Sequence, residues 1–190
     1  LLEHAPYRER DIRVPETLET HREDGRYKVR ILARGIFHDY YYDFHPFDIV
    51  GWDGYVYPWA FNIHNYQPIT GLVHMPPPTH QTFEAHNYVI CSFVPRMLDY
   101  HPDAVPAPYH HSNIDSDEVI YYANDKFGSR SVTLHPSGIP HGPQPGATEA
   151  SIGVKETKEL AVMVDTFHPL QITKQALEVE DPTYAMSWKG

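Results

Sequence analysis

Prolines and glycines interrupt this sequence so often that they leave little room for long helices. The aromatic-rich stretch 37–66 shows this best, because Pro46, Gly51, Gly54 and Pro58 divide it into short pieces. Proline cannot donate a backbone hydrogen bond to a sheet or helix, and glycine weakens the interior of either element, so both residues mark turns. The spacing therefore predicts short strands joined by turns.

Alternation of apolar and polar residues indicates where those strands lie. The segment 27–33, YKVRILA, alternates with a period of two, which is typical of a half-buried strand. Many short strands at regular spacing predict an all-β barrel or sandwich. Only Thr173–Val179, between Pro169 and Pro182, predicts a helix, and that helix is short. Further strands are predicted at 71–74, 88–94, 118–122, 131–134 and 160–166.

The length of 190 residues fits one main domain, and its charge limits the partners. Fifteen Lys and Arg stand against twenty-five Asp and Glu, and the formal net charge of −10 repels phosphate backbones and anionic membranes. No apolar run approaches the roughly 20 residues that span a bilayer. The single cysteine, Cys91, cannot form an intrachain disulfide, which fits a reducing compartment. We expect a cytoplasmic protein with no nucleic-acid partner and no membrane attachment.

The predicted organisation is one barrel domain behind a short entry segment. Residues 1–25 are expected to be extended and to end in the turn signal Glu23-Asp24-Gly25, and residues 26–190 are expected to form the barrel with the chemical site. The chain starts without Met, in charged and Pro-containing sequence. We therefore expect that a preceding N-terminal half is missing.

Two short segments supply candidate metal ligands. The segment 111–118, HSNIDSDE, offers a histidine and a carboxylate, and the segment 136–141, PSGIPH, ends in a second histidine. Two imidazoles and one carboxylate on one face of a metal ion leave open positions, as in mononuclear non-haem iron centres. A strand beginning near Glu118 and an adjacent strand preceding His141 would bring these groups together.

The register of this ligand set is open at two positions. His110 and His111 are adjacent, so either imidazole is a candidate, and Asp117 stands beside Glu118. We favour His111 together with Glu118, because Glu118 is the longer carboxylate and is followed at once by the apolar strand. With His141 these residues form the predicted metal triad.

Both segments resemble the two halves of a cupin metal motif, and the whole chain resembles the C-terminal half of the homogentisate 1,2-dioxygenase family. The resemblance implies a cupin-type double-stranded β-helix, or jelly-roll barrel, with long loops and a short C-terminal helix. Four stretches carry the match in the family's order: PFDIVGWDGYVYPWAFNI at 46–63, PYHHSN at 108–113, LHPSGIPHGP at 134–143, and an ending that contains Tyr184 and Trp188.

The resemblance also implies an activity and roles for residues. Members of the family use Fe(II) and O2 to cleave the ring of homogentisate to maleylacetoacetate, in the breakdown of tyrosine and phenylalanine, and they form trimers or hexamers. The family's triad corresponds to His111, Glu118 and His141. Its acid/base histidine corresponds best to His74, and a further histidine that is catalytic and contacts substrate corresponds to His135.

One departure from the family concerns the substrate. Where close relatives of the animal and plant enzymes have Tyr-x-x-Lys, this chain has Phe127-Gly128-Ser129-Arg130. Arg130 is expected to hold a substrate carboxylate, since its planar guanidinium makes two parallel hydrogen bonds. The alternatives are a gentisate-type dioxygenase, a cupin isomerase or hydrolase with Zn or Mn, and a cupin without catalysis, because two histidines and one carboxylate do not select one metal.

Overall fold

The structure is a computed structural model, and its contacts group the chain into two compact units. One unit comprises Leu1–Arg8 with Asn62–Gly190, and the other comprises Glu9–Phe61. The domain boundary predicted near residue 25 stays a prediction. The residues that the structure describes are 6–17, 19–47, 58–72, 77–102, 104, 109–124 and 130–189.

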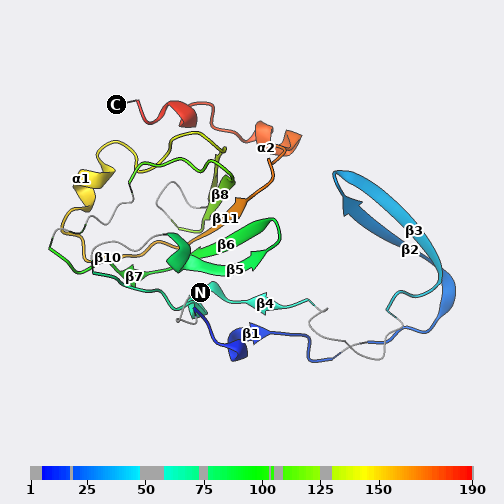
Figure 1. The fold of residues 1–190 in the computed structure, drawn as a ribbon. Coiled ribbons are helices and arrows are strands. Elements are labelled where there is room, and N and C mark those ends of the chain that lie inside the picture. Colours follow the sequence, from blue (N-terminus) through cyan, green and yellow to red (C-terminus); the bar gives the residue numbers. More distant parts are fainter. Residues whose placement is uncertain are drawn as a thin grey trace. The chain divides into compact units, whose positions relative to one another are not determined.

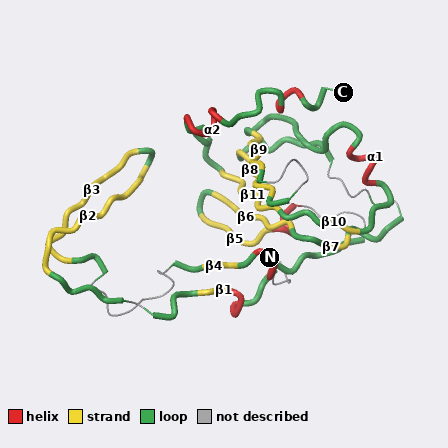
Figure 2. The backbone as a smooth tube through the Cα atoms, turned by 180° about the vertical axis from the view of Figure 1, so that it is seen from behind, coloured by secondary structure: helices red, strands yellow, loops and turns green. Residues whose placement is uncertain are grey.

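The larger unit is built on a five-stranded antiparallel sheet, which Figures 1 and 2 show from opposite sides. The predominance of strands over short helices confirms the predicted all-β class, and four of the five strands fall at the predicted positions. A separate two-stranded sheet pairs β7 (Arg96–Met97) with β10 (Glu156–Thr157). In spatial order the five strands are β5 (Gln81–Ala85), β6 (Tyr88–Phe93), β11 (Ala161–Thr166), β8 (Asp117–Tyr122) and β9 (Ser131–His135).

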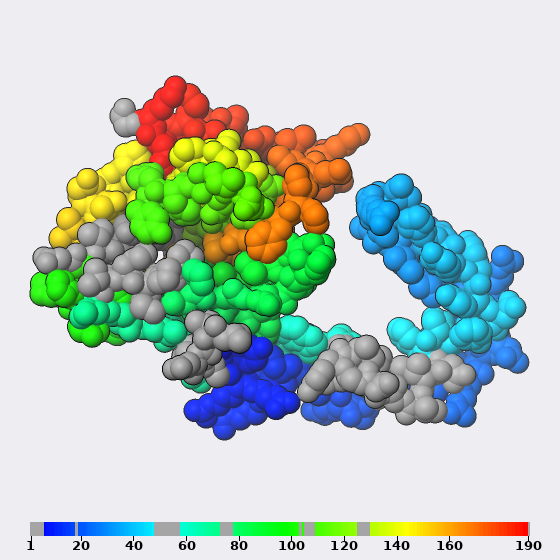
Figure 3. All heavy atoms as spheres, viewed as in Figure 1, coloured from blue at the N-terminus to red at the C-terminus, as the bar shows by residue number. Residues whose placement is uncertain are grey.

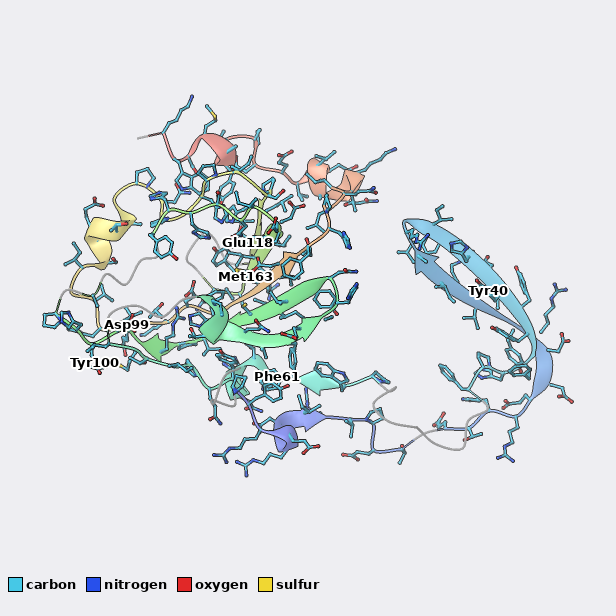
Figure 4. The ribbon with its side chains drawn as sticks, in the orientation of Figure 1. Tyr40, Phe61, Asp99, Tyr100, Glu118 and Met163 are labelled. Carbon is cyan, nitrogen blue, oxygen red and sulfur yellow. The ribbon has the colours of Figure 1, made fainter. Side chains whose placement is uncertain are left out.

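The central strand β11 places every second side chain in the core. Ala161 and Met163 are buried, and Met163 lies opposite Cys91 on β6 and Ile120 on β8. Two residues further along the same face, Asp165 lies opposite Glu118 on β8. Figure 4 labels Met163 and Glu118, which lie near each other within the larger unit. One face of the sheet therefore carries the apolar core and, at its end, the two carboxylates of Asp165 and Glu118.

The helices are short, as the sequence predicts. α2 (Lys174–Glu178) confirms the predicted C-terminal helix, and it is capped by Thr173, whose hydroxyl accepts a hydrogen bond from the backbone N–H of Ala176 at 3.2 Å. In the described part of the chain, no helix is long and apolar enough to cross a membrane. The other helical segments are α1 (Ala147–Ser151) and the 3-10 turns η1 (Glu9–Asp11), η2 (Ile63–Asn65), η3 (Pro77–His80) and η4 (Tyr184–Met186).

The smaller unit contains a long β-hairpin of β2 (Asp24–Ala33) and β3 (Ile36–Phe44). Its two turn residues, Arg34 and Gly35, have φ of 54° and 75°, as a two-residue type I′ turn requires. Across the hairpin, the Arg30 guanidinium donates two hydrogen bonds to the Asp39 carboxylate, at 2.7 and 2.9 Å. The hairpin confirms the strand predicted at 27–33. A short pair of strands, β1 (Ile12–Arg13) and β4 (Ala60–Phe61), completes this unit.

A buried histidine in the larger unit makes its stability depend on pH. His80 is 7% exposed, its ring packs against Phe93 with centroids 4.7 Å apart, and its Nδ1 has no hydrogen-bond partner among the described residues. Burial, and secondarily the charge of Arg96, lowers the pKa of His80 to about 4. An unfolded chain takes up this proton near pH 6.5. Stability is therefore complete above that pH and is lost as the pH falls towards 4.

We expect His80→Gln to flatten this dependence, because glutamine does not titrate. Urea unfolding at pH 7, 6 and 5 should show that the parent protein loses at most about 1.4 kcal/mol per pH unit through this group, and that the variant loses less. The exposed His86 supplies the control variant His86→Gln, which should follow the parent. Parallel loss in both variants would exclude His80 as the source.

Candidate metal centre

Two loops are joined by a pair of backbone hydrogen bonds at the candidate site. The N–H of His111 donates to the carbonyl of His141 at 2.9 Å, and the N–H of His141 donates back at 2.8 Å. In such an antiparallel pair both side chains project to the same side, and the two imidazole centroids are 4.5 Å apart. Glycine is needed at the next position, because a Cβ at Gly142 would lie 2.9 Å from the Cα of His110.

The carboxylate comes from the sheet. Glu118 is the second residue of β8, and its buried side chain points to the two histidines. One ligand atom from each of His111, Glu118 and His141 lies within 4.8 Å of the others, and a Glu118 oxygen is 3.5 Å from His141 Nε2. The structure thus brings the three predicted ligands together.

The histidines are held in the form that binds metal. The Nδ1 of His141 is 2.9 Å from the carbonyl of Ile139, and the Nδ1 of His111 is 3.2 Å from the carbonyl of Tyr109. A carbonyl only accepts, so each Nδ1 carries the proton and each Nε2 keeps its lone pair. His141 Nε2 is buried and has no hydrogen-bond partner in the described structure. Metal-binding histidines are oriented in this way, so the donor set fits a metal ion.

The charges at the site also suit a cation. Burial by itself would raise the pKa of Glu118, but the hydrogen bonds that it accepts from His135 and Asn113, and its proximity to the imidazoles of His141 and His135, outweigh burial and lower that pKa. Burial lowers the pKa of His141, which keeps this imidazole neutral. Asn113 donates a hydrogen bond to the second Glu118 oxygen at 3.3 Å. The site is an ionised carboxylate between two histidines.

The neighbouring candidates point elsewhere. The carboxylate of Asp117 accepts backbone hydrogen bonds from Ser137 and Leu170, both at 2.8 Å, and these bonds lower its pKa. Asp117 therefore ties β8 to two loops. His110 is exposed and lines a separate hollow of about 370 Å³ with Pro140, Pro143, Pro145 and Trp188. The geometry favours His111 over His110 and Glu118 over Asp117.

His135 lies beside the triad. It pairs with Glu118 across β8 and β9, and its Nδ1 is 2.7 Å from a Glu118 oxygen. Its ring stacks on His141 with centroids 4.3 Å apart. The structure therefore connects His135 to two of the predicted ligands, while its predicted catalytic and substrate-binding role stays a prediction.

The remaining predicted site residue that the structure describes, Arg130, is not part of this cluster. Arg130 is exposed and immediately precedes β9, at the end of the strand opposite to His135 and roughly 16 Å of strand away from it. Its role in substrate binding stays a prediction. His74 lies outside the described residues, as does most of the aromatic stretch 46–63.

Sequence reasoning assigned no role to Asp165. This carboxylate lies opposite Glu118 on the central strand, and one of its oxygens is buried without a hydrogen-bond partner in the described structure. Burial, and secondarily the charge of Glu118, raises the pKa of Asp165 to about 6. The signal was present in the sequence as an acidic residue within the apolar strand 161–166.

Measurements of metal affinity should show which of the two adjacent carboxylates, Asp117 or Glu118, binds the metal. We expect Glu118→Gln to weaken Co(II) or Fe(II) binding by at least about 100-fold, because an anionic ligand becomes a neutral amide. Asp117→Asn should keep the affinity of the parent and lose about 1–3 kcal/mol of stability, since a backbone N–H then faces an amide donor. Competition with a chelator and urea unfolding measure the two effects. The opposite pattern would make Asp117 the ligand.

Comparison with known proteins finds similarity to proteins that are named as dioxygenases. It is 45% identical over 196 residues to the "Putative dioxygenase" of Saccharolobus solfataricus, an alignment that covers 99% of this chain and 51% of the relative. It is 29% and 30% identical to the homogentisate 1,2-dioxygenases of Rhizobium rhizogenes and Rhizobium etli, over 76% of this chain and 37% of each enzyme. The chain matches no protein-family model.

The chain spans about half the length of the first of these relatives and less of the others. The similarity covers the segments with the two histidines and the carboxylate, as the near-complete alignment with the first relative requires. The predicted resemblance to the homogentisate 1,2-dioxygenase family is therefore confirmed.

Proposed function

We propose that the chain carries the metal centre of an Fe(II)-dependent dioxygenase that cleaves the ring of homogentisate or a close relative such as gentisate. The observation that supports it most is the buried, unpartnered Nε2 of His141 beside His111 and Glu118, in a chain related to named dioxygenases. Two histidines and one carboxylate are the ligand set of such iron enzymes.

The ligands set the charge and the geometry of the centre. His111, Glu118 and His141 would hold the ion, which would supply a common binding site for substrate and dioxygen. One carboxylate and two neutral imidazoles leave a divalent ion with a net charge of +1. This charge favours an anionic substrate, such as an aromatic acid with an acidic ring hydroxyl.

Other residues are proposed from the family resemblance. His74 would accept the proton of the ring hydroxyl as substrate binds, His135 would contribute to the active site, and Arg130 would pair with a substrate carboxylate. We also propose that the protein is cytoplasmic and assembles as a trimer or hexamer.

The reaction is balanced without another reductant. Homogentisate plus O2 gives maleylacetoacetate, in which one ring C–C bond has been broken and both atoms of dioxygen have been retained. Labelling with ¹⁸O2 should therefore place two heavy oxygen atoms in the product, and one mole of O2 should disappear per mole of substrate.

Oxygen uptake tests the proposal directly. Protein loaded anaerobically with Fe(II) should consume oxygen with homogentisate or, if the substrate is the close relative, with gentisate. His111→Gln should abolish this oxygen uptake by removing a metal ligand. His110→Gln is the matched control and should retain uptake. An iron-loaded, folded parent that consumed no oxygen with either substrate would overturn the proposal.

Metal analysis distinguishes an iron dioxygenase from an isomerase or hydrolase that uses Zn or Mn. Protein purified without added metal should contain iron at about one ion per site if the proposal holds. Zn or Mn at that stoichiometry, without oxygen uptake, would instead favour an isomerase or hydrolase, and an unchanged metal content in His141→Ala would favour a cupin without catalysis.

A further inference from the structure

Both ring nitrogens of His135 are engaged in hydrogen bonds. Nδ1 is 2.7 Å from a Glu118 carboxylate oxygen, and Nε2 is 3.0 Å from the hydroxyl of Tyr184. An ionised carboxylate only accepts, so Nδ1 carries the proton, and the neutral ring then accepts the Tyr184 proton at Nε2. These contacts form a continuous chain from Tyr184 through His135 to Glu118.

Tyr184 is held in place by the loop that carries a metal ligand. It begins η4, and Ser187 Oγ donates to the Tyr184 carbonyl at 2.7 Å while accepting from Gln144 Nε2 at 3.0 Å. Trp188 Nε1 donates to the carbonyl of Gly142 at 3.2 Å. In Figure 3 the red C-terminal segment lies against the yellow part of the chain. The C-terminal segment 184–188 is therefore fastened beside His141.

The aromatic rings add packing to these bonds. The Tyr184 and Trp188 rings meet edge to face with centroids 5.0 Å apart, and the Trp188 and His135 rings are also arranged edge to face, with centroids 6.3 Å apart. Burial raises the pKa of Tyr184, so its hydroxyl keeps the proton that it donates. The hydroxyl of Tyr184 thus contacts His135, while its ring packs against Trp188. A substitution that removes only the hydroxyl therefore tests the first contact and keeps the second.

We infer that Tyr184 is a positioning residue of the metal centre: its hydroxyl fixes the tautomer and ring orientation of His135, which in turn orients the Glu118 carboxylate. The inference deepens the proposed function, because it rests on the same metal centre. It gives His135 the task of directing a ligand, as partners of metal-binding side chains do. Both nitrogens of His135 are engaged in this arrangement, so a direct contact between His135 and substrate would have to displace one of these hydrogen bonds.

Tyr184→Phe isolates the hydroxyl, since phenylalanine keeps the ring against Trp188. We expect Co(II) binding to weaken by about tenfold and the visible Co(II) spectrum to change, because Glu118 loses its fixed orientation. The matched control is Tyr121→Phe on β8, which removes the hydroxyl of a 40% exposed tyrosine and should leave both readouts unchanged. A purely structural role would lower the melting temperature of the metal-free protein without changing the spectrum.

A double-mutant cycle checks that the effect passes through His135. His135→Phe should weaken Co(II) binding by about 10- to 100-fold, and adding Tyr184→Phe should then cost little more. Additive losses would overturn the inference. So would an unchanged affinity and spectrum in Tyr184→Phe when the parent binds Co(II). A parent that binds no metal would instead refute the metal centre of the proposed function.

The tautomer can also be read in the parent protein, without any variant. In the Zn(II)-loaded protein at pH 8, ¹⁵N–¹H correlation of the imidazoles should show His135 protonated at Nδ1 and unprotonated at Nε2. A proton on Nε2 alone would contradict the chain of hydrogen bonds and overturn the inference.

Discussion

The site depends on the two backbone hydrogen bonds between His111 and His141. These residues are thirty positions apart, and neither belongs to a named strand. The bridge sets both imidazoles on one side, and the carbonyls of Tyr109 and Ile139 then fix the tautomer of each ring. Because backbone geometry does this work, the histidine side chains need few additional contacts.

The sheet positions the third residue of the predicted triad, Glu118. Glu118 is the second residue of a strand whose later residues pack in the core, so its position is tied to the stability of the whole sheet. A buried carboxylate is costly unless it is hydrogen-bonded, and His135 and Asn113 provide those bonds. The polar end of the core face is thus stabilised by mutual contacts, and Tyr184 extends them to the C-terminal segment.

Much of the fold was predictable because its signals are local. Short segments between Pro-rich connections predicted the strands near 88–94, 118–122, 131–134 and 160–166, and the position of 173–179 between two prolines predicted the short helix. The strand β5 and the helix α1 were not predicted. Their segments are short, and β5 is recognisable mainly through its pairing with β6, which is a contact between strands rather than a pattern within one.

The sequence by itself determined the all-β class, the family resemblance and the residue types of a two-histidine, one-carboxylate centre. Only the tertiary structure separated Glu118 from Asp117, because adjacent residues on a strand face opposite sides and only the fold shows which of the two sides carries the histidines. It alone brought Tyr184 to His135, forty-nine residues away, since no local pattern encodes a contact between side chains that meet only when the chain folds.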